Sequence, residues 1–509
     1  MALYMNNNSF WFEKRTIVAL SLSMLALAEI VDLTIVSVAL PHLMGALEAN
    51  INQISLTLTS YIVASAIFIP LTGFATKKYG FKKVALVSAI IFGISSVLCG
   101  MSTSLVEMVV FRILQGVGGA FLPALAQGYI VENFDTQEQP KVMLVFSLCV
   151  VMGPIIGPLF GGYIVEHLTW RWIFYVNVPI CLIGIVLITL LMKESELENI
   201  KTDYISFSFM AIGIGCLEYF LDEGNQNSWL QSKEMVIILV TGIIATGFFI
   251  WRGLIGKSVV NFKIFKSMTF NLSCFLVFAF MVMAVLSLAY FPTLLQQGYG
   301  YPVDLAGYIT SPRGIFALIA APIFINLAKK KDPRKILFLG LLIYTLSCVT
   351  MIWYGASAST PLILLTLSLQ GIGLTATFVI LIQLAFIELP NQLSNDAAGI
   401  FNFFRNIGNS VGTSIAATII SRQQQISWHD MGSKITQYNH NVYNFVTALN
   451  GNTLNIKAQL IASEIQLQAF LIANLDTFYV SLIGMLCILW VPFFLKKPDP
   501  NVQTTVTIH

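Results

Sequence analysis

The sequence predicts an all-α integral membrane protein that crosses the membrane about fourteen times. Of its 509 residues, 56% are hydrophobic and only 10% are charged, and the mean hydropathy is +0.78. A soluble domain carries about 25% charged residues, so this composition indicates that lipid is the main solvent. About fourteen stretches are apolar over roughly the 20 residues that a membrane-crossing helix needs. The expected spans are 16–41, 53–75, 84–103, 106–131, 142–165, 171–192, 204–222, 235–253, 270–296, 304–328, 335–355, 361–388, 396–420 and 474–495.

Lysine and arginine residues divide unevenly between the two faces of the membrane. An even number of spans puts both termini on one face, and that face carries 20 of the 28 Lys and Arg residues, against five on the other. Cytoplasmic loops are enriched in Lys and Arg, so both termini are expected in the cytoplasm. The first apolar run, from Thr16 to Leu40, is too long for a signal-peptide core and is expected to remain as the first span.

Two motifs recur in the same order in the two halves of the chain. A basic turn, Gly73–Lys83, is followed roughly forty residues later by Gln115–Gly118, and Leu327–Lys335 is followed at a similar distance by Gln370–Gly373. Parallel repeats of this kind form the halves of many transporters. The repeat predicts two six-helix bundles with the seventh and eighth spans as an inserted pair. The expected units are an N-terminal bundle (1–195), the inserted pair (196–265), the first five C-terminal helices (266–420), a non-cytoplasmic loop (421–473), and the last helix with a cytoplasmic tail (474–509).

Charged residues within the spans are the candidates for chemistry, because a charge in the membrane is costly and usually functional. Glu29 and Asp32 lie three residues apart in the first span, on one helix face. Burial disfavours an ionised carboxyl group and a nearby cation favours it, so these acids are candidates for proton exchange. Arg112 in the fourth span is the expected partner of Asp32. The alternative is a static ion pair that only fixes helix packing.

Three further polar residues are candidates for a substrate cavity. Gln115 is one turn from Arg112 and could face the centre of the bundle. Glu218 is the one acid deep within the inserted pair, and Arg405 is an intramembrane cation of the thirteenth span.

The fifth span contains a glycine and proline motif, Gly153–Gly162. Prolines remove backbone donors and kink a helix, and glycines at a spacing of four flatten one face for close packing. A helix at a moving interface would need such a face, whereas dimerisation through the same face is the alternative. The residues of this expected conformational motif are Gly153, Pro154, Gly157, Pro158, Gly161 and Gly162.

The sequence contains no motif of an enzyme or a nucleotide-driven motor. It has neither a GxxxxGK[ST] phosphate loop nor an HExxH or GxSxG motif. No cofactor or metal is expected, and an ion gradient is the expected energy source. The polar segment 421–472 is either a solvated loop or a docking site for a periplasmic partner, and its end, Leu454–Ala473, has the alternation of a surface helix.

The chain resembles the major facilitator superfamily and, within it, the fourteen-helix drug:proton antiporters of the EmrB/QacA type, most of all the EmrB-like members. Two positions depart from the usual family pattern: Lys77 stands where the basic turn normally has an acid, and Phe81 replaces an arginine. Leu144 also stands where the fifth-helix motif usually begins with glycine. The similar segments are Asp32–Pro41, Arg112–Gly116, Gly153–Gly162, Trp170–Pro179, Leu221–Gly224 and Asn261–Lys266.

This resemblance implies that protons move inward while small hydrophobic, drug-like compounds move outward across a bacterial inner membrane. It implies protonation of Asp32 with Arg112 as its electrostatic partner. It also implies a periplasmic membrane-fusion adaptor and an outer-membrane channel as partners, with 421–472 as the docking segment. Two alternatives remain: a dedicated exporter of one metabolite, such as a siderophore or fatty acid, and a membrane receptor that transports nothing.

Overall fold

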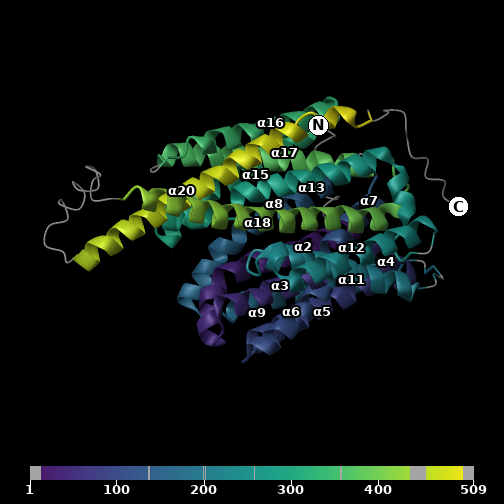
Figure 1. Ribbon diagram of the computed structural model, residues 1–509. Helices are drawn as coiled ribbons and strands as arrows, with labels where there is room; N and C mark the ends of the chain where they lie inside the picture. Colours follow the sequence, from purple (N-terminus) through teal and green to yellow (C-terminus); the bar gives the residue numbers. More distant parts are fainter. Residues whose placement is uncertain are drawn as a thin grey trace.

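The computed structural model describes residues 13–135, 138–195, 197–198, 200, 202–256, 258–355, 358–435 and 454–496. All regular elements within these residues are helices, which confirms the predicted fold class. The N-terminal helices, purple to blue, form the lower half of the molecule in Figure 1, and the green to yellow C-terminal helices form the upper half.

Two spans of the N-terminal half are each divided into shorter helices near a proline. Pro70 lies at the junction after α3, and Pro123 lies in the first turn of α7, where its missing N–H is tolerated. The chain continues in nearly the same direction at both places, so 53–79 and 105–133 each form one span. The elements are α2 (Lys14–Ala46), α3 (Ile51–Phe68), η1 (Ile69–Leu71), α4 (Thr72–Tyr79), α5 (Phe81–Met101), α6 (Leu105–Gly119), α7 (Leu122–Asn133), α8 (Gln139–His167), α9 (Trp172–Tyr175) and α10 (Asn177–Leu191).

The inserted pair, α11 (Tyr204–Glu223) and α12 (Lys233–Leu254), lies beside both bundles. Helix α11 packs against α3 of the first bundle and against α18 of the second. Thr59 of α3 donates a hydrogen bond to Asp222, and Ser414 of α18 donates one to the Leu221 carbonyl at 2.6 Å. The pair is therefore bonded to both halves of the protein. A short 3₁₀ turn, η2 (Trp229–Gln231), separates its two helices.

The C-terminal half repeats the six-helix plan. Its first span includes a five-residue π-helix, η4, a rare form that often occurs at functional sites. The elements are η3 (Phe262–Lys266), α13 (Met268–Leu288), α14 (Phe291–Thr293), η4 (Leu294–Gly298), α15 (Val303–Lys330), α16 (Pro333–Ile352), α17 (Thr360–Phe386), η5 (Asn391–Leu393), α18 (Ser394–Ser433), α20 (Leu454–Ile488) and η6 (Val491–Phe494).

Fourteen long helical segments correspond to the fourteen expected spans, and among the described residues twelve helices are long and apolar enough to cross a membrane. Helices α8 and α18 occupy the two remaining positions. Helix α18 carries Asp396, Asn402 and Arg405 and is polar for a membrane helix, but α7, α13 and α20 pack around it. Neighbouring helices therefore shield polar residues that lipid would not accept.

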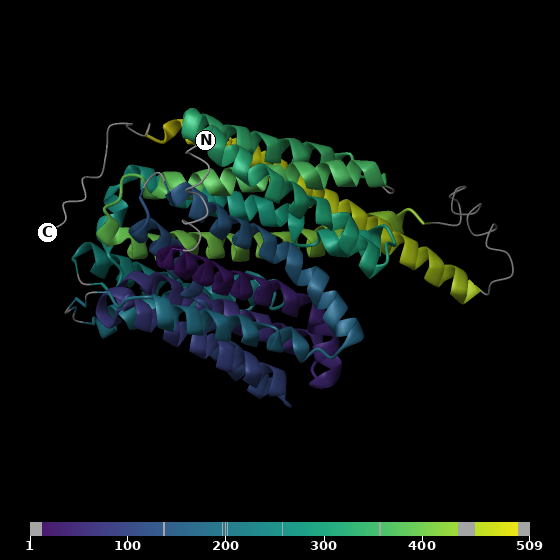
Figure 2. The same ribbon diagram turned by 180° about the vertical axis from the view of Figure 1, so that it is seen from behind.

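The described parts of segment 421–473 are helical, as the alternation in Leu454–Ala473 predicts for its end, and the helix also extends into its start, which the sequence did not predict. Helix α18 continues to Ser433, 13 residues beyond the predicted end of its span, and α20 already begins at Leu454. Side-chain hydrogen bonds between residues one turn apart stabilise these helical ends; Gln468, for example, donates to Glu464 at 2.9 Å. Nε2 of Gln423 in α18 donates a hydrogen bond to Oδ2 of Asp476 in α20 at 2.7 Å. Helix α20 projects beyond the other helices in both Figure 1 and Figure 2; residues 436–453 lie outside the described part.

Residues assigned to the same membrane face by the Lys/Arg pattern lie at the same end of the structure. Arg15 forms an ion pair with Glu138 at 3.0 Å, and Lys496 lies 3.8 Å from Glu388. Lys77 pairs with a residue at the start of α18. These contacts join helices that the predicted topology brings together at the end of the molecule nearest the termini.

Candidate functional site

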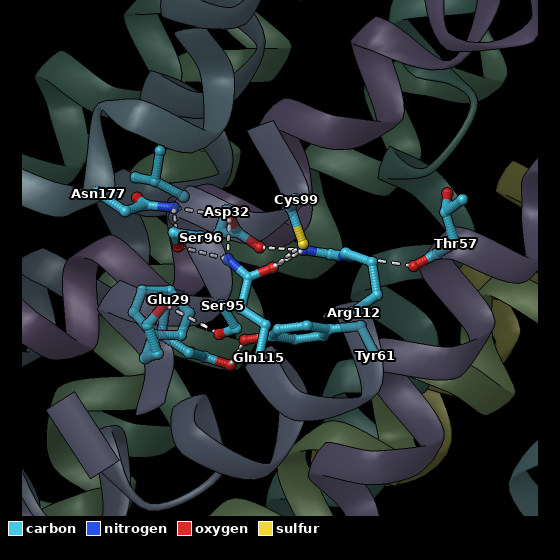
Figure 3. Close-up of polar contacts among 12 residues, drawn as sticks. Glu29, Asp32, Thr57, Tyr61, Ser95, Ser96, Cys99, Arg112, Gln115 and Asn177 are labelled. Carbon is cyan, nitrogen blue, oxygen red and sulfur yellow. Dashed lines mark hydrogen bonds and ion pairs between the residues drawn. The ribbon is translucent and has the colours of Figure 1, made fainter. Parts of the chain in front are cut away.

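The central site is a buried ion pair between α2 and α6 (Figure 3). Nη1 of Arg112 lies 2.5 Å from Oδ2 of Asp32, and both side chains are fully buried. The expected contact between these two residues is therefore present. A buried pair of this kind is maintained only if further hydrogen bonds satisfy the remaining atoms.

Two amide side chains complete the environment of the Asp32 carboxylate. Nδ2 of Asn177, at the start of α10, donates to Oδ1 at 2.7 Å, and Nε2 of Gln115 donates to the same oxygen at 3.0 Å. Gln115 also donates to Ser96 of α5 at 2.8 Å and accepts from Arg112 at 2.7 Å. Four helices of the N-terminal bundle thus contribute to one hydrogen-bond network, shown in Figure 3.

The guanidinium of Arg112 forms hydrogen bonds through two of its three nitrogens and packs against aromatic rings. Its Nε donates to the Thr57 carbonyl at 3.0 Å, and its guanidinium lies over the Tyr61 ring at 4.3 Å from the centroid. The guanidinium also lies over the Phe174 ring, at 5.9 Å from its centroid. Aromatic faces stabilise a desolvated cation. Nη2 alone has no hydrogen-bond partner among the described residues.

Glu29 lies one turn from Asp32 but belongs to a different set of contacts. Its Oε1 accepts a hydrogen bond from the Tyr61 hydroxyl at 3.3 Å, and Oε2 has no partner among the described side chains. Since Tyr61 also supports Arg112, one phenol connects the Glu29 carboxyl group to the ion pair. The predicted proton-coupling residues are therefore adjacent, although only Asp32 contacts the arginine.

The glycine face of α8 packs against α2, the helix that carries Asp32. A side chain at Gly153 would collide with Ile30, one at Gly157 with Thr34, and one at Gly161 with Ile35. The Thr34 hydroxyl also donates to the Gly153 carbonyl at 3.4 Å. This face is occupied within the chain, which leaves it closed to the alternative of dimerisation. Gly162 has no neighbour close enough to require glycine, and the side chains of Pro154 and Pro158 lie outside the described set.

The three predicted cavity residues are not brought together by direct bonds. Gln115 belongs to the Asp32 network, Glu218 accepts a hydrogen bond from Ser410 of α18, and Arg405 contacts the neighbouring Asn406. Within the described chain, no hydrogen bond or ion pair joins any two of them. Their role as cavity residues stays a prediction.

Sequence reasoning gave no role to Asn177, Ser96 or Tyr61. Asn177 opens the apolar run of α10, and a single amide at the start of such a run is a detectable signal. Ser96 and Tyr61 carry no such signal, because serine and tyrosine are common in membrane helices and neither residue is charged. Only the packing of α3 and α5 against α6 identifies them as part of the site.

The two bundles are bonded to each other at the end that carries Lys77. Nζ of Lys77 lies 2.5 Å from Oδ2 of Asp396. Six residues further along α18, Asn402 donates to Gln127 of α7 at 2.6 Å. Lys77 stands where the family pattern has an acid, so here the cation lies on the first bundle and the acid on the second.

A membrane bundle of two repeated halves, with a carboxylate–guanidinium pair buried inside the first half, is typical of a membrane transport protein. A model of the Major Facilitator Superfamily matches residues 22–413. The chain therefore belongs to the major facilitator superfamily.

Two relatives are multidrug export proteins named EmrB. The one from Haemophilus influenzae is 30% identical over 494 residues, covering 95% of this chain and 96% of the relative. The one from Escherichia coli K12 is 31% identical and covers 84% of each chain. The fatty acid resistance protein FarB of Neisseria gonorrhoeae is 29% identical over 83% of this chain and 84% of its own length.

Solved structures support the fold independently of sequence. The human organic anion transporter MFSD10 superposes with a TM-score of 0.58 at 12% identity, covering 92% of this chain and 99% of that one. The proton:xylose symporter XylE gives the same TM-score at 14% identity, covering 96% and 97%. At these identities the likeness shows the fold alone.

Proposed function

We propose that this protein is a proton-coupled antiporter that exports small hydrophobic compounds by alternating access. The observation that carries the proposal is the Asp32 carboxylate, fully buried and bonded to Arg112, Gln115 and Asn177. An intramembrane carboxyl group of this kind can bind and release a proton during a transport cycle. The similarity to two EmrB multidrug export proteins supports export and a broad range of hydrophobic substrates.

The geometry suggests how a proton could act. All three partners of Asp32 donate hydrogen bonds, so this arrangement fits the ionised carboxylate. Protonation would remove the negative charge and leave the buried guanidinium of Arg112 uncompensated, which is strongly unfavourable. The network would then rearrange, and a conformation with different helix contacts would gain population.

Helix packing offers a route from the carboxyl group to the rest of the bundle. Asp32 lies between Ile30 and Thr34, which rest on the glycine face of α8. Helix α8 also packs on α15 of the second bundle. A shift of α2 would therefore press on a helix at the interface between the bundles. Opening toward the cytoplasm would require the Lys77–Asp396 contact to break.

The test is transport by purified protein in liposomes with an imposed pH gradient. Wild-type protein should concentrate a hydrophobic dye in an acidic lumen, and Asp32→Asn should abolish this uphill transport while the protein stays folded. Asp430→Asn is the matched control, because Asp430 is an exposed acid paired only with Lys434 on the projecting part of α18. Uphill transport by Asp32→Asn at the wild-type rate would remove Asp32 from the mechanism.

A second candidate is a dedicated exporter of one metabolite, such as a fatty acid. The observation that favours it is the similarity to FarB over most of both chains. Growth of an exporter-deficient bacterium that expresses this protein separates the candidates. Resistance to several unrelated hydrophobic toxins supports multidrug export, and resistance to a single compound supports the dedicated exporter. A receptor that transports nothing would give neither resistance nor flux in liposomes.

We further propose a bacterial inner-membrane location with both termini in the cytoplasm, and a tripartite assembly with a periplasmic adaptor and an outer-membrane channel. The projecting end of α20 supports this idea, because it extends beyond the bundle at the end of the molecule opposite α4, the helix that carries Lys77 (Figure 1). Deletion of residues 430–465 should leave transport in liposomes unchanged and reduce resistance in cells. Loss of both activities would instead indicate that the segment is needed for folding.

A further inference from the structure

Arg405 of α18 is a buried cation without a partner of opposite charge. Its side chain is 5% exposed, and its Nε and Nη2 contact only Oδ1 of the neighbouring Asn406, at 3.4 and 3.2 Å. Nη1 has no hydrogen-bond partner among the described residues, and no described acid lies within ion-pair distance of the guanidinium. Arg112, in contrast, contacts a carboxylate directly.

The arginine faces the centre of the protein. Asn402, three residues earlier and therefore on the same helix face, donates to Gln127 of the opposite bundle at 2.6 Å. From that opposite bundle, Glu29 is the acid whose charge acts on Arg405, although the two groups form no ion pair. Oε2 of Glu29 is also unpartnered. Arg405 and Glu29 are thus two buried groups of opposite charge type, one in each bundle, and each has an atom without a hydrogen-bond partner among the described residues.

The second bundle has an excess of positive charge within the membrane. Arg112 of the first bundle is neutralised by Asp32, whereas neither Arg313 nor Arg405 of the second bundle has an acid within 4.0 Å among the described residues. A desolvated guanidinium without hydrogen-bond acceptors is costly to maintain. A ligand that supplies acceptor oxygens and a negative charge would remove this cost.

We propose that Arg405 binds the carboxylate of amphipathic weak acids, which are therefore a preferred substrate class of this transporter. The inference rests on the proposed function, because it assigns a substrate class to the same central interface. The planar guanidinium offers two parallel N–H donors that match a carboxylate. Glu29 supplies the compensating negative charge when no substrate is bound, and the substrate anion replaces that charge when it binds. Hydrophobic cations are disfavoured at this position by the same positive field.

The binding test compares two probes with one skeleton, pyrenebutyrate and its neutral amide, pyrenebutyramide. Purified wild-type protein should bind the carboxylate more tightly than the amide. Arg405→Gln should weaken carboxylate binding by about tenfold or more and leave amide binding nearly unchanged, because a charge-assisted hydrogen bond is lost only with the anion. Arg405→Lys keeps the charge without the bidentate geometry and should give an intermediate affinity.

Arg422→Gln is the matched control, because it removes the same charge from an exposed position of the same helix. It should change neither affinity. Unchanged amide binding by Arg405→Gln shows that the variant is folded, and if that variant does not fold, the ratio measured with Arg405→Lys decides. Equal affinity of the wild type for both probes, binding of neither, or an unchanged ratio in the Arg405 variants would overturn the proposal.

Transport in liposomes separates this inference from the proposed function. If the pH gradient drives uptake of both probes and the Arg405 variants slow them equally, proton-coupled export stands and the carboxylate site is wrong. If Arg405 governs carboxylate binding but no gradient drives either probe, the site stands and the proposed antiport fails.

Discussion

Helices α6 and α17 are the corresponding members of the two bundles, and their glycines pack in the same way. A side chain at Gly118 would lie 2.6 Å from the Phe92 nitrogen of α5, and one at Gly373 would lie 2.6 Å from the Tyr344 nitrogen of α16. Gly116 packs closely against the Tyr61 carbonyl of α3, and its counterpart Gly371 packs closely against the Arg313 carbonyl of α15. The repeated glycines therefore preserve a three-helix contact in both halves.

The chemistry beside those glycines differs. In α6, Arg112 and Gln115 bond to Asp32, whereas in α17 the position equivalent to Arg112 is Leu367. The second glutamine, Gln370, donates only to the Met351 sulfur at 3.3 Å, and its Oε1 has no described partner. The comparison teaches that packing is shared by the two repeats, while the buried ion pair, which we propose binds the proton, occurs in one of them.

The largest expected effect comes from making α6 resemble α17. Arg112→Leu should lower the free energy of unfolding by about 3–5 kcal/mol, because the Asp32 carboxylate stays buried without its cation. The melting temperature of the purified protein in detergent measures this loss. The double variant Asp32→Asn with Arg112→Leu removes both charges and should recover most of the stability but no transport. A double variant that melts no higher than Arg112→Leu alone would contradict the account.

Substitution of the glycines should affect the two repeats alike. Gly118→Ala and Gly373→Ala each place a methyl group against backbone atoms of a neighbouring helix, so each should lower the free energy of unfolding by about 1–3 kcal/mol. Thermal melting again provides the measurement, with Gly247→Ala as control because no atom lies within 4 Å of a side chain there. A clear difference between the two repeat variants would show that packing is not equivalent in the two halves.

The two glutamines should respond differently to the same change. Gln115→Leu removes a donor to Asp32 and to Ser96, and should cost about 1–2 kcal/mol and reduce uphill transport. Gln370→Leu should change stability by about 0.5 kcal/mol or less, because its only described contact is a weak one to sulfur. Transport rates and melting curves of both variants test this. Equal losses would mean that the second glutamine has a function that its contacts do not reveal.

A modest effect is expected where the bundles meet at Lys77. Asp396→Asn removes the charge but keeps an oxygen acceptor beside Lys77, whose side chain is 17% exposed, and should shift the balance between conformations by about 1 kcal/mol. Chemical labelling of a cysteine placed at the cytoplasmic end of the interface should therefore become faster. The exchanged pair, Lys77→Asp with Asp396→Lys, should restore slow labelling. If the exchanged pair labels as fast as Asp396→Asn, this ion pair does not hold the bundles together.

Much of the fold could be predicted from sequence because membrane helices have a strong local signal. Apolar runs, the Lys/Arg asymmetry and the repeated glycines indicate the helices and their grouping without knowledge of contacts. The end of α18 could not be predicted in this way. Its residues beyond Ile420 are polar, and helix formation there depends on contacts such as Gln423 with Asp476 of α20.

The candidate site was predictable in its charged residues and in Gln115, which lies one turn from Arg112. Asp32 and Arg112 stand out because charge is rare in a membrane span, and their pairing follows from opposite sign. The pairing of Lys77 with Asp396 joins residues more than 300 positions apart, and the sequence holds no local signal for it. Asn177 has a local signal, an amide at the start of an apolar run, but its bond to Asp32 depends on where α10 places that amide.

The most direct test of the central claim is proton release when purified protein binds a hydrophobic substrate in weakly buffered detergent solution. The account predicts that wild-type protein releases protons over part of the pH range, and that Asp32→Asn binds the substrate but releases none at any pH. Release from Asp32→Asn equal to that of the wild type would contradict the account, since the exchanged proton would then belong to another group.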